Sequence, residues 1–203
     1  MNRLLRRPTA LLGALLLASG LAQAQTTATA PRPVKVLVIS MFGPEAEPWI
    51  QPFQLTESIP VPGLSPDYPA LRCNRDDVCL LTTGMGHANA AASVLAVTLD
   101  PRLDLRQTWF LIAGIAGIDP AQGTLGSAAW ARWLVDTGIA HEIDAREMPK
   151  DWKTGYFGVL TAGPGIKPKL EYRTEVARLN DALVNKALAL SREVPLADSP
   201  QAR

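Results

Sequence analysis

Three stretches of the chain are almost continuously apolar, and this pattern predicts buried strands. Residues 34–40, 78–83 and 107–113 are rich in Val, Leu and Ile, with few polar interruptions. An alternating pattern would indicate a strand with one face in water, whereas a continuous run is typical of a strand covered on both faces. We therefore expect three strands that belong to one sheet.

The segments between these runs predict helices of different lengths. Residues 87–99 form an alanine-rich stretch whose small side chains permit a helix to pack closely on a sheet. Seven prolines within residues 44–70 argue against a long helix there. A short helix near residues 45–51 and an extended piece near residues 55–61 are expected instead.

The second half of the chain has a weaker pattern. Residues 123–135 are apolar and predict more strand. A stripe at helical spacing follows Thr174, which predicts that Thr174 caps a last helix. The stripe consists of Val176, Leu179, Leu183, Ala187 and Leu190. The order strand, helix, strand predicts an α/β layered fold, with a central mixed or parallel sheet flanked by helices.

The first 24 residues predict a secretory signal peptide. Three arginines precede an apolar run over residues 10–22, and Ala22-Gln23-Ala24 is an A-x-A cleavage site. A membrane anchor is the alternative, but a span needs about 20 apolar residues. Cleavage after Ala24 would leave residues 25–33 as a flexible tail before a domain of residues 34–203. We therefore expect an exported protein, periplasmic or extracellular.

Composition excludes several classes of protein. The chain has 20 basic and 19 acidic side chains, and loss of the three signal-peptide arginines leaves 17 against 19. This balance argues against a nucleic-acid-binding protein, because there is no basic excess to neutralise phosphates. No second apolar run is long enough to span a membrane. With two cysteines and two histidines, we expect no metal site, and no cofactor is expected either.

The two cysteines flank a predicted turn. Cys73 and Cys79 lie on either side of an Asn-Arg-Asp-Asp sequence, between two short strand-like pieces. Cysteines that face each other across a hairpin can form a disulfide in an oxidising compartment. Two free thiols are the alternative, and the expected export favours the disulfide.

Each of the three predicted strands is followed by a turn that contains glycine. These glycines are Gly43 after the first strand, Gly84 and Gly86 after the second, and Gly114 and Gly117 after the third. Ligands of open α/β sheets bind beyond the carboxyl ends of the strands, where glycine lets backbone amides come close. Each turn alone could use glycine for conformation only. Together they indicate a shared pocket, although not for a dinucleotide, because Asn89 replaces the third glycine of that motif.

Few ionisable side chains are candidates for chemistry. Glu45 could bind a sugar hydroxyl or activate water, or it could simply be an acid in the first turn of a helix. His87 could donate to a ligand, or it could be a surface histidine. The sequence His141-Glu142-x-Asp144 resembles a metal cluster, but a single histidine argues against zinc.

Taken together, three longer segments resemble the purine nucleoside permease family. Residues 34–49 include Ser-Met-Phe-Gly-Pro-Glu-Ala-Glu-Pro-Trp, and residues 73–89 include Thr-Thr-Gly-Met-Gly-His-Ala-Asn. Residues 110–126 include Ala-Gly-Ile-Ala-Gly-Ile-Asp-Pro and Gly-Thr-Leu-Gly. The resemblance extends over about residues 34–203 and implies a role in nucleoside uptake. The family is similar in turn to nucleoside phosphorylases and nucleosidases, which implies their α/β fold.

The wider resemblance also implies roles for single residues. Gly43 would meet the phosphate or ribose side of a purine nucleoside, and Glu45 would occupy the region of a water-activating carboxylate. Gly84, Gly86 and Asn89 match the motif that begins the helix under the pocket, and with their neighbours Met85 and His87 they are the expected ligand contacts of this turn. The turn that lines the ribose and base would supply Gly114, Ala116 and Gly117.

Two departures from the wider pattern limit what the resemblance implies. Phosphorylases of this fold hold phosphate with an arginine and a serine or threonine around the third turn, but residues 112–116 contain neither. This argues against phosphorolysis, because a buried phosphate without such partners is costly. The family's fold continues beyond residue 203, so we expect the chain to be incomplete at its C-terminal end.

Three functions remain open after these arguments. The chain could bind nucleosides during uptake, as a homo-oligomer or with an unidentified membrane partner. It could be a nucleosidase that cleaves the N-glycosidic bond, with Glu45 as the base. It could also be a shortened chain that is inactive alone, so whether the protein is an enzyme stays undecided.

Overall fold

A computed structural model describes residues 30–169 and 173–196, in two compact units. The first unit extends to Ile115, and the second begins at Ala116. The expected signal peptide, residues 1–24, lies outside the described residues. No helix in the described part of the chain is both long and apolar enough to cross a membrane.

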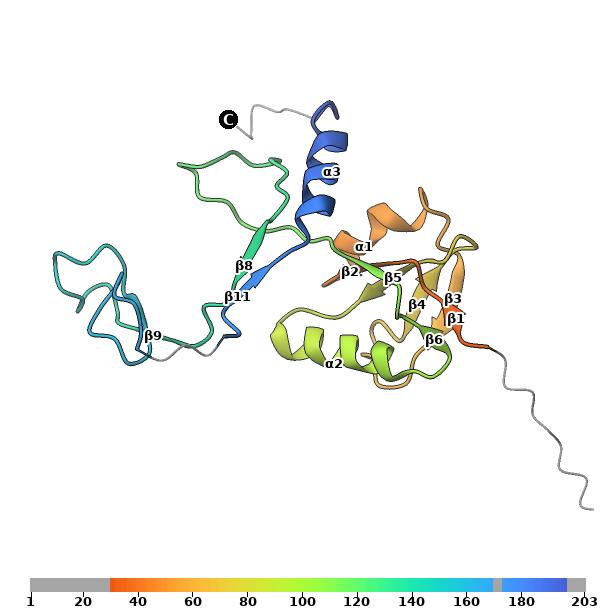
Figure 1. Ribbon diagram of the computed structural model, residues 1–203, viewed down its shortest axis with the longest axis horizontal. Helices are drawn as coiled ribbons and strands as arrows, with labels where there is room; N and C mark the ends of the chain where they lie inside the picture. The colour runs from red at the N-terminus through yellow and green to blue at the C-terminus, as the bar shows by residue number, and fades with distance from the viewer. Residues whose placement is uncertain (1–29, 170–172, 197–203) are drawn as a thin grey trace, which may run out of the picture. The chain divides into compact units, whose positions relative to one another are not determined.

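The first unit contains a mixed five-stranded sheet in the order β3-β4-β5-β2-β7 (Figure 1). The strands β2 (Val36–Ser40), β5 (Val78–Thr82) and β7 (Trp109–Ile112) run parallel. The strands β3 (Glu57–Pro60) and β4 (Ala70–Cys73) add antiparallel pairs on the side of β5. The central mixed sheet is therefore confirmed, and the three apolar runs form its parallel part.

Two helices of the first unit cover opposite faces of this sheet. Leu37 of β2 packs in a cluster with Val97 of α2 (His87–Leu99). Val38, the next residue of β2, packs in a second cluster with Ala46 of α1 (Gly43–Ile50). Because successive side chains of a strand point to opposite faces, α1 and α2 lie on different sides of the sheet (Figure 1). This arrangement confirms the layered α/β architecture.

The third apolar run is less buried than its pattern indicates. The side chains of Trp109, Phe110 and Ile112 are 55, 51 and 61% exposed. Their strand, β7, is at the end of the five-stranded order, and within residues 30–169 and 173–196 it pairs with β2 only. Strand β7 is therefore an edge strand within the described residues, and a continuous apolar pattern cannot distinguish an edge from a centre.

A short parallel pair joins the start of the described chain to the segment after α2. The strand β1 (Arg32–Pro33) pairs with β6 (Leu103–Asp104). Residues 32 and 33 belong to the segment expected as a flexible tail, and here they have backbone partners: Arg32 N donates to Arg102 O at 2.8 Å.

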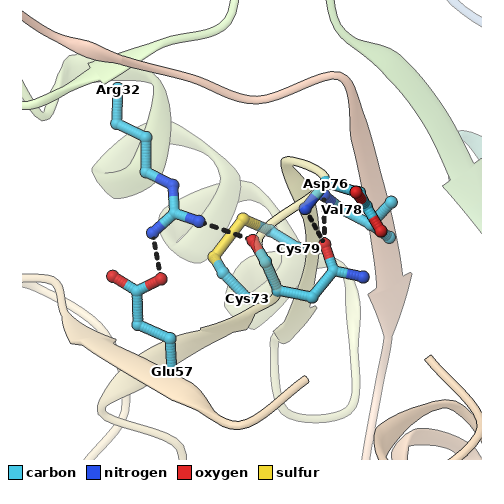
Figure 2. Close-up of polar contacts among 7 residues, drawn as sticks. Arg32, Glu57, Cys73, Asp76, Val78 and Cys79 are labelled. Carbon is cyan, nitrogen blue, oxygen red and sulfur yellow. Dashed lines mark hydrogen bonds and ion pairs between the residues drawn. A yellow bond between two sulfur atoms is a disulfide. The ribbon is translucent and has the colours of Figure 1, made fainter. Parts of the chain in front are cut away.

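A disulfide and one arginine secure the hairpin between β4 and β5 (Figure 2). Cys73 and Cys79 lie directly opposite each other in the antiparallel register. Both are fully buried, and a disulfide bond joins them. The Asn74 side-chain oxygen accepts hydrogen bonds from two backbone amides of the turn, each at 3.0 Å. Arg32 donates to the Asn74 carbonyl at 2.7 Å and forms an ion pair with Glu57. The turn predicted between the cysteines therefore has its own polar partners.

The described part of the second unit contains two antiparallel pairs and a helix. The strand β8 (Trp133–Val135) pairs with β11 (Val176–Arg178), and β9 (Ala140–Glu142) pairs with β10 (Tyr156–Gly158). The helix α3 comprises Asp181–Ser191. The strand expected over residues 123–135 is thus reduced to its last three residues.

The expected helix cap at Thr174 is wrong. Val176 pairs with Val135 of β8, so the first member of the predicted stripe lies in a strand, and the second, Leu179, lies between β11 and α3. The helix begins only at Asp181, where the Asn180 side chain accepts a hydrogen bond from Leu183 N at 3.1 Å. The spacing of the stripe was compatible with a helix, but β-branched Val176 and the pairing with β8 favour a strand at its start.

Candidate functional site

The carboxyl ends of the three parallel strands meet at one edge of the sheet. The register pairs Ser40 with Thr82 and Ile39 with Ile112. Backbone hydrogen bonds continue the pairing past the strands, since Thr83 N donates to Ser40 O and Ala113 N donates to Ile39 O, both at 2.9 Å. The three glycine-containing turns therefore begin side by side, as the sequence predicted. We call this edge, from the turns to the first turns of α1 and α2, the carboxyl edge.

Glu45 lies at the carboxyl edge and links two of the turns. One carboxylate oxygen, Oε2, accepts a hydrogen bond from Met41 N at 2.7 Å, in the turn after β2. The other oxygen, Oε1, accepts from Ile115 N at 2.9 Å, in the turn after β7. Glu45 is only 7% exposed. Its carboxylate is therefore a buried acceptor that connects segments 70 residues apart in the sequence.

Gly114 provides the space that this connection needs. A Cβ at this position would lie 2.4 Å from Met41 Cε and 3.3 Å from Glu45 Oε1. The lack of a side chain lets the backbone after β7 approach the turn after β2 closely. Gly114 thus allows the turn after β7 to pack against the turn after β2.

The turn after β5 depends on backbone conformation instead. Gly84 and Gly86 have φ angles of +80° and +94°, which L side chains rarely adopt. Asn89 closes this turn, because its side-chain nitrogen donates to Met85 O at 2.8 Å. The side chains of Met85 and His87 are exposed. The turn therefore presents these two side chains, and the beginning of α2, to solvent.

Buried and half-buried hydroxyl groups support the carboxyl edge, and sequence reasoning missed them. Ser40 Oγ lies 3.0 Å from Thr82 Oγ1, and both residues are buried. Ser93 Oγ of α2 donates to Thr83 O at 3.1 Å, and the Tyr68 hydroxyl accepts from Gly43 N at 3.2 Å. A polar residue at the last position of each buried strand was the available signal, but its partner is known only from the register. Among the described residues, each buried side-chain nitrogen and oxygen has a hydrogen-bond partner.

The structure brings most of the predicted site residues together at the carboxyl edge. They are Gly43, Glu45, Gly84, Met85, Gly86, His87, Asn89 and Gly114. Ala116 and Gly117 belong to the second unit, so this edge is described only as far as Ile115. The predicted ligand contacts of these residues stay predictions.

The residues that resembled a metal cluster have separate partners in the second unit. The His141 ring contacts the Phe157 ring, with centroids 5.1 Å apart, and Glu142 accepts a hydrogen bond from the Tyr156 hydroxyl at 2.9 Å. Asp144 forms an ion pair with Arg146, and this hydrogen-bonded guanidinium lowers the pKa of Asp144 to about 2. No group of three or more potential metal ligands occurs within residues 30–169 and 173–196.

Comparisons with known proteins agree on one family. The model of the family described as purine nucleoside permease matches residues 33–203. A purine nucleoside permease of Candida albicans is 37% identical over 166 residues, which are 80% of this chain and 41% of the relative. A probable purine nucleoside permease of Schizosaccharomyces pombe is 36% identical over 179 residues, or 83% of this chain and 51% of the relative.

The chain spans about half the length, or less, of these relatives. No solved structure matches it, so the similarity to the nucleoside phosphorylase fold stays an expectation. The family match, in contrast, covers nearly all of the chain after the expected signal peptide. The resemblance seen in the three glycine-containing segments is confirmed, and the chain belongs to the purine nucleoside permease family.

Proposed function

We propose that the chain binds purine nucleosides at the carboxyl edge and acts in their uptake. Family membership supplies the substrate class, because both relatives are named as purine nucleoside permeases. The observation that carries the location is the register of the parallel strands, which places Ser40 beside Thr82 and Ile39 beside Ile112. Backbone groups of three turns then border one edge, where α/β sheets commonly bind ligands.

The turn after β7 lacks the partners that a bound phosphate needs. Residues 112–116 carry no arginine, serine or threonine. Ile115 N, a donor in this turn, is already engaged by the Glu45 carboxylate. A phosphate ion would therefore meet a carboxylate here without a cationic partner, which is unfavourable. This supports binding or hydrolysis over phosphorolysis.

Hydrolysis is the second candidate function, with Glu45 as the group that activates water. In the structure both Glu45 oxygens accept backbone hydrogen bonds, and the residue is 7% exposed. A general base has to reach the proton that it removes, directly or through one water. The buried and engaged carboxylate therefore supports binding without cleavage as the main proposal.

One experiment separates these functions. The purified chain and the Candida albicans relative would be titrated with inosine, adenosine and guanosine by calorimetry, and incubated mixtures would be analysed for free base with and without phosphate. We expect saturable binding without base release. Base release that needs phosphate would overturn the argument from residues 112–116, and base release without phosphate would establish hydrolysis. If the relative bound nucleosides and this chain did not, the chain would be inactive on its own.

We further propose that the protein is exported, to the periplasm or beyond the cell, after removal of residues 1–24. The support is the order of arginines, apolar run and A-x-A sequence in residues 1–24. Expression in a bacterial host, followed by fractionation and mass spectrometry, tests this. We expect a secreted product that begins at Gln25, whereas an intact product in the cytoplasm would refute the proposal.

A further inference from the structure

Glu45 is the residue of the carboxyl edge whose side chain contacts two different turns. Its two oxygens accept hydrogen bonds from Met41 N at 2.7 Å and Ile115 N at 2.9 Å. The first amide follows β2, and the second follows β7. One side chain therefore accepts hydrogen bonds from the backbone amides of two turns that follow different strands.

The geometry of a carboxylate makes this contact a spacer. The two oxygens are held at a fixed separation by one carbon, so the amides that they accept are held at a corresponding separation. Hydrogen bonds from N–H groups to a charged acceptor are shorter and stronger than those between neutral groups. Both hydrogen bonds require a close approach of the two turns. Gly114 permits this approach, because an added Cβ would lie 3.3 Å from Glu45 Oε1.

The burial of Glu45 gives this contact weight. A carboxylate that is 7% exposed has lost most of its hydration, and the two amides replace part of it. Removal of one acceptor would leave a backbone N–H without a partner in a part-buried place. The turns would then be free to separate or to hydrate.

We propose that Glu45 is a positioning residue, which sets the spacing between the turns after β2 and β7 and thereby the affinity of the carboxyl edge for a nucleoside. The effect on affinity rests on the function proposed above. The spacing itself is a property of the free protein and can be measured without a ligand.

The test compares Glu45→Gln with Glu47→Gln in the full chain. Glutamine at position 45 keeps the shape but turns one acceptor oxygen into an NH₂ donor that would face a backbone N–H. Glu47 is an exposed carboxylate of the same helix, so Glu47→Gln removes the same charge without touching the turns. Amide hydrogen exchange of Met41 and Ile115 is measured by NMR in each free protein, and inosine affinity is measured by calorimetry.

We expect faster exchange at one or both amides in Glu45→Gln, and inosine binding weaker by about ten- to a hundredfold, the factor that corresponds to one hydrogen bond with a charged partner. Glu47→Gln should match the wild type in both measurements. Unchanged exchange in Glu45→Gln would refute the spacer. Faster exchange with unchanged affinity would refute its role in binding.

Other outcomes are equally decisive. If the wild type cleaved inosine and Glu45→Gln lost cleavage but not binding, Glu45 would be a catalytic residue and the proposal would be wrong. If the wild-type protein did not bind nucleosides, the proposed function and the claim on affinity would both be wrong. The exchange rates would still decide whether Glu45 holds the two turns together. Should Glu45→Gln not fold, Gly114→Ala tests the same contact from the other side, because its Cβ would push against Met41 Cε and Glu45 Oε1.

Discussion

Reduction of the disulfide offers the sharpest test of how the first unit is stabilised. Cys73 and Cys79 are six positions apart and close a small loop at the β4–β5 turn (Figure 2). A crosslink stabilises a protein chiefly by restricting its unfolded chain, and the effect grows slowly with the size of the loop. For a loop this small, the chain-entropy treatment gives about 2 kcal/mol at 25 °C.

The folded hairpin has other contacts that survive reduction. Asn74 accepts two backbone hydrogen bonds within the turn, and Arg32 donates to the Asn74 carbonyl. Both cysteines are fully buried in the core cluster, so their sulfur atoms continue to fill space after reduction. We therefore expect the reduced protein to keep its hairpin and to lose only the contribution of the crosslink.

Urea unfolding of the oxidised and reduced protein measures this contribution. With a slope of roughly 2 kcal/mol per molar urea, the midpoint should fall by about 1 M on reduction. Hydrogen exchange of the β5 amides reports the first unit by itself and should show the same loss. The double variant Cys73→Ala, Cys79→Ala should be insensitive to reductant, and less stable than the reduced protein because two buried sulfur atoms are missing.

Two results would refute this reasoning. Equal midpoints for the oxidised and reduced protein would mean that the unfolded chain is not restricted by the crosslink. A loss of more than about 5 kcal/mol, beyond the range that crosslinks give, would mean that the hairpin depends on the disulfide for its shape.

Three further predictions concern single positions. Gly86→Ala should lower the free energy of unfolding by about 1–2 kcal/mol in thermal melts, because φ is +94° and ψ is 154° there while the added Cβ meets nothing within 4 Å, so the loss is backbone strain alone. Asp104 should titrate near pH 2 by NMR, because the Arg106 side chain lowers its pKa to about 2 from 3.8, and Arg106→Gln should return it toward 3.8. Since the folded-state pKa is lowered, this pair stabilises the protein above about pH 4 and its contribution is lost as the pH falls toward 2. Asn180→Ala should cost about 0.5–2 kcal/mol and reduce the helicity of α3 by circular dichroism, because the side-chain acceptor for Leu183 N is lost.

Hydropathy predicted the centre of the fold well and its margins poorly. The runs over residues 34–40 and 78–83 contain β2 and β5, and the alanine-rich stretch is α2 with the expected bounds. The strands β2 and β5 are buried and keep a continuous apolar run, and α2 is rich in alanine throughout, so a local pattern is enough to identify these elements. The start of the stripe after Thr174 failed because its strand partner, β8, lies about 40 residues earlier and no local pattern reveals it.

The candidate site shows the same division between local and distant information. Positive φ angles at Gly84 and Gly86 are local, and glycine in a turn after a strand indicates them directly. The contact between Glu45 and Ile115 spans 70 residues, and the sequence could suggest only that Glu45 was a candidate for chemistry. Its partners are backbone amides, which every residue carries, so no residue type marks them in advance.

The turns of the carboxyl edge are therefore stabilised by two different kinds of contact, and this difference has a measurable consequence. The turn after β5 is shaped by its own glycines and by the bond from Asn89 to Met85 O, whereas the turns after β2 and β7 share the Glu45 carboxylate. Substitutions that share contacts couple, while those without common partners add. Glu45→Gln and Gly114→Ala should thus be non-additive in unfolding free energy, and Glu45→Gln and Gly86→Ala should add to within about 0.5 kcal/mol. Strong coupling in the second pair would mean that all three turns form one unit, and that Glu45 is not a spacer for two of them alone.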